Sequence, residues 1–174
     1  MKVKTLLLLM ILSVSTIYSQ KANNTVKWRS TETDTLTVAQ AMFDDQNFVM
    51  AYPYLNQLQK NHPTEPFLMY LTGICALFKE GKQEKGLEFL LIVYNDNKNA
   101  EDIEFYLALG YHYNDEFEKS IEFADKYLSR KRLTKPQIRS AEKVKDYSQR
   151  KEKLVPLADE GKLDDYIKLS EDGN

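Results

Sequence analysis

Apolar side chains recur at helical spacing in three segments of equal length. The segments are VAQAMFDDQNFVMAYPYLNQL from Val38, GICALFKEGKQEKGLEFLLIV from Gly73 and LALGYHYNDEFEKSIEFADKY from Leu107. They align without internal gaps, at offsets of 35 and then 34 residues. A fixed period of this size predicts stacked helix–turn–helix units, because each unit buries its apolar face only against a neighbour.

Each segment has the same internal order of apolar stripe, polar turn and second stripe. The second stripe carries a small residue at one equivalent position, Ala51, Gly86 or Ser120, which allows two helices to approach closely. Proline and turn-forming residues separate the units, so the sequence predicts hairpins over about 35–66, 67–100 and 101–135.

These positions resemble the tetratricopeptide repeat. The resemblance rests on Leu107, Ala108, Tyr111, Phe117 and Ser120 in the third unit, on Tyr70, Leu77, Gly81 and Gly86 in the second, and on Phe48, Ala51 and Pro63 in the first. It implies an all-α protein, a right-handed superhelical stack of about three helical hairpins with a C-terminal capping helix.

The stretch FYLALGYHYNDEFEKSIEFADKYL has a narrower resemblance. It is similar to the repeat region of exported Bacteroidetes proteins in which helical repeats precede a β-propeller and an OmpA-like domain, some of them linked to type IX secretion. This sequence contains no propeller or OmpA-like segment, so peptidoglycan binding does not carry over. The resemblance implies an envelope location and a scaffolding role.

Residues 1–20 have the order of a secretory signal peptide. Lys2 and Lys4 precede an apolar run from Leu6 to Val14, and cleavage is expected near Ser19 or Gln20. A retained membrane anchor is the competing interpretation, although the run is shorter than the ~20 residues of a spanning helix. Residues 21–34 are expected to form a polar linker, with Trp28 either docked on the first hairpin or serving as a partner anchor.

The C-terminal part, 136–174, is predicted to cap the stack. Residues 136–155 are expected to form a helix with a sparse apolar stripe of Ile138, Ala141, Val144 and Leu154. Such a helix is needed because an uncovered last repeat would expose its packing face. A short helix is expected after Pro156, with Leu163, Tyr166 and Ile167 on its apolar side.

The charge balance favours neither nucleic acid nor an anionic membrane. The chain has 24 Lys and Arg against 26 Asp and Glu, a formal charge of −2 that becomes −4 once Lys2 and Lys4 are removed. Cys75 is the only cysteine, so no internal disulfide forms, and its apolar surroundings favour burial.

The sequence offers little chemistry for catalysis. Two histidines and one cysteine lack the paired spacing of zinc ligands, and no glycine-rich phosphate loop is present. No nucleophile-and-base motif stands out, so we predict a protein that is not an enzyme, with no metal and no cofactor.

In tetratricopeptide stacks the first helices line the concave surface, which implies an apolar groove here. Under the alignment it is lined by Leu36, Gln40, Phe43, Leu71, Cys75, Phe78, Lys79, Phe105, Leu109, His112 and Tyr113. An exposed apolar surface of this kind marks an interaction site. The alternative is that these side chains are buried by the protein itself, under residues 136–170 for instance.

The expected function is a non-catalytic scaffold or adaptor that binds a protein in the bacterial envelope. It is expected in the periplasm or associated with the outer membrane, linked to outer-membrane or secretion-system assembly. A glycan- or peptidoglycan-associated accessory protein is the alternative. It is suggested by the other domains found in the similar proteins and by the eleven tyrosines of this chain.

Overall fold

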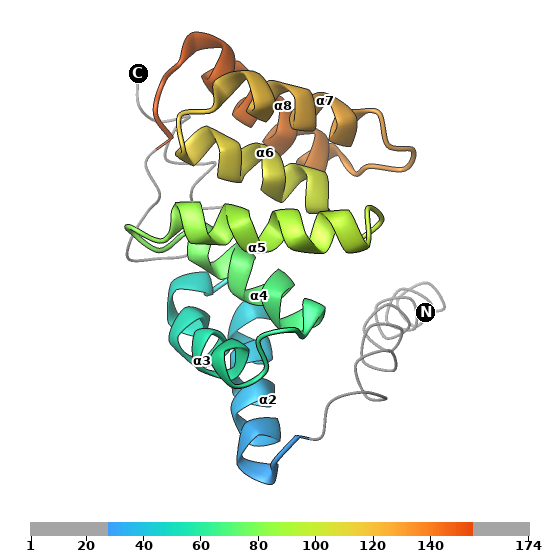
Figure 1. Ribbon diagram of the computed structural model, residues 1–174. Coiled ribbons are helices and arrows are strands. Elements are labelled where there is room, and N and C mark those ends of the chain that lie inside the picture. The colour runs from blue at the N-terminus through green and yellow to red at the C-terminus, as the bar shows by residue number, and fades with distance from the viewer. Residues whose placement is uncertain (1–27, 155–174) are drawn as a thin grey trace, which may run out of the picture.

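The computed structural model describes residues 28–154, which form seven α-helices (Figure 1). They pack as consecutive antiparallel pairs, three hairpins followed by a capping helix, and the predicted all-α class is confirmed. The helices are α2 (Ser30–Asp44), α3 (Phe48–Asn61), α4 (Pro66–Leu77), α5 (Gln83–Asp96), α6 (Ile103–Tyr113), α7 (Phe117–Leu128) and α8 (Lys135–Arg150).

The three hairpin turns share one backbone conformation at one repeat position. Gln46, Gly81 and Asp115 all have positive φ, at 58°, 68° and 60° respectively. They are separated by the same 35 and 34 residues as the aligned segments. Gly adopts this left-handed region without steric cost, and Asp tolerates it better than most residues. The repeat therefore extends from the sequence pattern to the backbone geometry of the turns.

The small residues of the second helices lie where neighbouring helices approach most closely. Ala51, Gly86 and Ser120 are all buried. A Cβ atom added to Gly86 would lie 2.8 Å from the carbonyl oxygen of Gly73 on α4. This backbone-to-backbone approach explains why the second hairpin carries glycine at this position.

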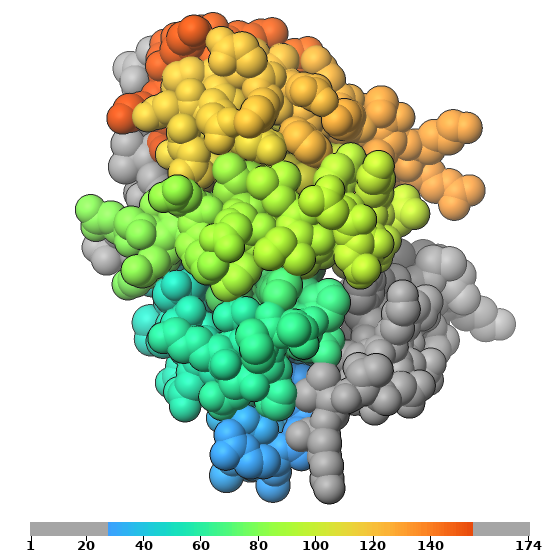
Figure 2. All heavy atoms as spheres, viewed as in Figure 1, coloured from blue at the N-terminus to red at the C-terminus, as the bar shows by residue number. Residues whose placement is uncertain are grey.

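Each helix packs chiefly on its neighbours in the sequence. In the space-filling view, α4, α5 and α6 follow one another in contact along the stack (Figure 2). Leucine and aromatic side chains fill the interfaces, and Leu55, Leu77, Leu90 and Leu107 are fully buried. Packing between consecutive helices thus forms one continuous core along the described residues.

The first helix begins at Ser30, within the stretch expected to be a linker. The side chain of Glu32 accepts a hydrogen bond from the backbone N–H of Arg29 at 3.0 Å, and Arg29 pairs with the same carboxylate at 2.6 Å. These contacts hold the pKa of Glu32 well below its usual range. Asn61 also donates to Glu32 at 3.1 Å, so the end of α3 anchors the start of α2.

Trp28 docks on this first hairpin, as one of the two interpretations predicted. Its ring lies 4.7 Å from that of His62, centroid to centroid, and the side chain is half-buried. The expected signal peptide and the short helix after Pro156 lie outside the described residues.

Helix α8 covers the exposed side of the last hairpin. Thr134 caps its N-terminus by accepting a hydrogen bond from the backbone N–H of Gln137. Ala141 and Val144 are buried against α6 and α7, and Leu154 is 7% exposed. Two residues of the expected apolar stripe, Ala141 and Val144, therefore pack inward, and Ile138 is half-buried. The predicted extent of 136–155 is wrong, because α8 ends at Arg150 and Leu154 lies beyond the helix.

Candidate functional site

The eleven residues predicted to line a groove do not form one open surface. Six are buried, namely Leu71, Cys75, Phe78, Phe105, Leu109 and His112. Leu36, Gln40, Phe43 and Tyr113 are half-buried, and Lys79 is exposed. For these six side chains the second interpretation, burial by the protein itself, is confirmed. They belong to the core and are not available to a partner.

An aromatic side chain of α3 covers Phe43 and Phe78, two of the predicted groove residues. The ring of Phe78 stacks on that of Phe48 at 4.8 Å, and Phe43 meets Phe48 edge-on at 5.1 Å. Phe48 is the first residue of α3, so this cover comes from within the first hairpin.

The C-terminal part does cover His112. The backbone N–H of Leu154 donates to Nε2 of His112 at 3.0 Å, and Nδ1 lies 2.8 Å from Oγ of Ser148 on α8. Ser148 Oγ is also 2.8 Å from Ser120 Oγ, and Ser120 donates to the carbonyl of Ala108. A buried polar network therefore joins α6, α7 and α8.

Burial lowers the pKa of His112 to about 4, so the ring is neutral near pH 7. Because Nε2 accepts a hydrogen bond, the neutral ring carries its proton on Nδ1 and donates to Ser148. A histidine beside a serine is one element of nucleophilic catalysis. Here both side chains are at most 2% exposed, and Nε2 is occupied by a backbone N–H, so the geometry supports a structural role.

Cys75 is fully buried in α4, and burial raises the pKa of its thiol well above the ordinary value. Residues 28–154 contain no group of three or more His, Cys, Asp or Glu side chains placed to hold a metal ion. Within the same range no helix is long and apolar enough to cross a membrane.

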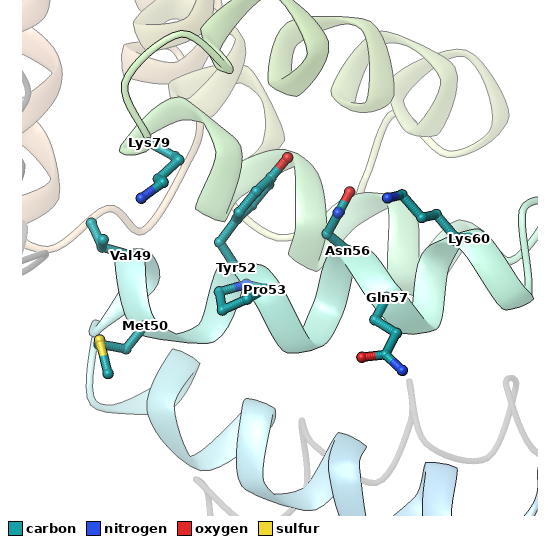
Figure 3. Close-up of a pocket in the computed structure, with 8 residues that line it drawn as sticks. All are labelled: Val49, Met50, Tyr52, Pro53, Asn56, Gln57, Lys60 and Lys79. Atoms are coloured by element: carbon teal, nitrogen blue, oxygen red, sulfur yellow. The ribbon is translucent and has the colours of Figure 1, made fainter.

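A surface groove of about 600 Å³ runs along the solvent-facing side of α3 (Figure 3). Lys79, from the turn after α4, lies near Val49 at one end, and Lys60 lies toward the other end of α3. The lining residues are Val49, Met50, Tyr52, Pro53, Asn56, Gln57, Lys60 and Lys79. Of the predicted site residues, the structure places only Lys79 in this groove.

The outer face of α3 differs from the same face of the other hairpins. Tyr54, Phe89 and Phe123 occupy equivalent positions, but Tyr54 is 40% exposed whereas the two phenylalanines are at most 8% exposed. The ammonium of Lys85 lies 4.5 Å from the ring of Phe89, and that of Lys126 lies 4.4 Å from the ring of Phe123.

No lysine occupies either flanking position in the first hairpin. Met50 stands at the position of Lys85, and Gln57 at that of Lys126. Met50 is 55% exposed, the most exposed large apolar side chain among the described residues. The sequence contains this signal, because an apolar residue replaces lysine at an aligned outward position, whereas the site predicted from the sequence lies on the first helix of each hairpin.

Comparison with known proteins supplies no relative, since no family model, no curated protein and no solved structure matches the chain.

Proposed function

We propose that the protein is a non-catalytic scaffold that binds another protein through the outer face of α3. The observation that carries this proposal is the exposure of Met50 and Tyr54 where the other hairpins cover an aromatic ring with lysine. Exposed apolar side chains that gather beside a groove are typical of interaction surfaces. We name Met50, Pro53, Tyr54 and Gln57 the α3 face.

The tetratricopeptide-like repeat and the envelope location complete the proposal. Three hairpins with equivalent turns and small residues support a repeat of this type. Such stacks act by presenting extended surfaces to partners. The N-terminal pattern of a signal peptide supports a protein exported to the periplasm or to the outer-membrane surface.

The test is capture of a partner from envelope extracts by the purified chain and by two single variants. Met50→Lys gives the first hairpin the residue found at this position in the other two. Ile92→Lys is the matched control, because Ile92 is 44% exposed on the outer side of α5. We expect one protein to be captured by the wild type and by Ile92→Lys, and not by Met50→Lys.

The captured protein is then purified and titrated against the same three chains. If only Met50→Lys lowers the binding affinity at least tenfold, the result supports the α3 face as the binding surface. Equal binding by all three chains contradicts it. Glycan binding by the purified chain without protein capture would favour the glycan-associated alternative.

A further inference from the structure

The α3 groove has one lysine toward each end, Lys79 in the turn after α4 and Lys60 near the end of α3. Neither makes an ion pair with a described acidic side chain, which is also true of Lys82, Lys98 and Lys135, so both ammonium groups can take an acidic partner. The groove wall is apolar at the Lys79 end, with Val49, Met50, Tyr52 and Pro53, and Asn56 and Gln57 follow toward Lys60. The groove therefore matches a segment with an apolar centre and acidic ends.

The length of the groove sets the length of such a segment. Val49 and Lys60 are eleven residues apart on α3, about 16 Å along the helix axis. An extended segment covers this distance with about five residues. Each lysine ammonium is carried on a flexible four-carbon stem, so the acidic groups need only approximate placement.

The chain itself contains a segment with this pattern. Residues 163–172, LDDYIKLSED, carry Asp164 and Asp165 before the apolar centre and Glu171 and Asp172 after it. The centre contains the side chains of Tyr166, Ile167 and Leu169. This segment lies outside the described residues.

The end of the described chain lies within reach of the groove. Leu154 is held by His112, at the end of α6, and His112 aligns with Phe78, the residue before Lys79 in the preceding hairpin. Figure 1 shows the last described residues and the turn between α4 and α5 on the same side of the stack. Packed helices lie about 8–10 Å apart. Residues 155–162 span up to about 27 Å when extended, more than one hairpin requires.

We propose that residues 163–172 of the same chain occupy the α3 groove, with an acidic pair at each of Lys60 and Lys79 and the apolar centre against Met50 and Pro53. Exposed ion pairs contribute little by themselves. Most of the binding free energy is therefore expected from the apolar contact and from the short linker, residues 155–162. The linker keeps the segment at a millimolar effective concentration near the groove.

The consequence is a surface that regulates its own availability. If the α3 face binds a partner, that partner must displace residues 163–172, and a segment with the same acidic and apolar pattern is suited to do so. This consequence rests on the proposed function, whereas occupation of the groove does not.

The experiment is disulfide trapping in the full chain. Met50→Cys combined with Ile167→Cys is oxidised with diamide, and intramolecular bond formation is followed by intact mass and gel filtration. Ile92→Cys with Ile167→Cys is the matched control, since Ile92 is similarly exposed on the next hairpin. Cys75 is buried and is the same in both chains.

We expect the Met50 pair to form an intramolecular disulfide at least ten times faster than the Ile92 pair. Lys60→Glu with Lys79→Glu should remove most of this difference, and adding Asp164→Lys with Glu171→Lys should restore it. Equal rates for the two pairs overturn the proposal, as does a rate that charge reversal leaves unchanged. Disulfide-linked dimers also overturn it, because they place a second copy in the groove. None of these readouts depends on a partner, so a failed capture experiment leaves them intact.

Discussion

The backbone N–H of Leu154 donates a hydrogen bond of 3.0 Å to Nε2 of His112, forty-two residues earlier in the chain. This contact attaches the segment after α8 to the core of the third hairpin. It also requires a neutral ring, because protonated Nε2 would present a second donor to the N–H of Leu154.

His112 should make stability depend on pH. Its pKa of about 4 lies below the ordinary value of 6.5, so the unfolded chain binds more protons than the folded chain between these values. The contribution is present above about pH 6.5 and is lost as the pH falls toward 4. Its size is on the order of 2 kcal/mol, because one pKa unit corresponds to about 1.4 kcal/mol and electrostatic screening reduces the full value. Urea unfolding at several pH values measures it.

The control for this prediction is His112→Gln, whose amide can accept from Leu154 but does not titrate in this range. Asp115 is the charged group that acts on the His112 ring, and both chains retain it. The wild type should show the steeper loss of stability from pH 6.5 to pH 4. Parallel curves for the two chains would contradict the assignment.

Phe78→Ala should destabilise the fold by about 3–5 kcal/mol, because Phe78 is 2% exposed and stacked on Phe48. Met50→Ala removes a large side chain that is 55% exposed and should change stability by less than about 0.5 kcal/mol. The midpoints of denaturant unfolding compare the two. A near-wild-type midpoint for Phe78→Ala would return this residue to the candidate partner contacts.

Gly86→Ala should destabilise the protein despite the higher helix propensity of alanine. The new Cβ would lie 2.8 Å from the backbone oxygen of Gly73, which cannot move without displacing α4. Overpacking of this kind costs about 1–3 kcal/mol. Gly110→Ala is the control, because its closest neighbours are the side chains of Leu87 and Leu77 at 3.1 and 3.3 Å. Thermal unfolding should show a lower midpoint for Gly86→Ala than for Gly110→Ala.

Mature protein from the native cell should begin near Gln20 or Lys21. The apolar run that ends at Val14 is long enough for a signal peptide and short for a membrane span. Intact-mass measurement decides this, and Leu9→Lys, which interrupts the run, should retain the full N-terminus. A wild-type mass that still includes residues 1–19 would support the retained anchor instead.

The sequence predicted the helices better than the site. Proline and turn residues marked the hairpin ends, and the observed helices follow the expected order over 35–135. Because polar residues precede residue 35, the sequence predicts that the first helix starts there, whereas the contacts of Glu32 with Arg29 and Asn61 extend the helix to Ser30. A contact between residues 32 and 61 has no local sequence signal.

The burial of the predicted groove residues could not be read from the sequence. Phe43, Phe78 and His112 stand at one equivalent position of the three aligned segments and form a row, but the alignment has no information about what packs over that row. Phe48 covers the two phenylalanines, and α8 with Leu154 covers His112. Both covers come from parts of the chain outside the row.

The sequence by itself determined the helical class, the period and the hairpin turns, because these depend on spacing, proline placement and residues that tolerate a left-handed backbone. Tertiary structure decided which apolar residues face solvent. Burial depends on what the neighbouring helices place opposite a side chain, so the aligned residues Tyr54 and Phe123 differ in exposure. Tyr94 on α5 and Tyr111 on α6 pack against the ring of Phe123, each at 5.4 Å, whereas Tyr54 is 40% exposed in the first hairpin.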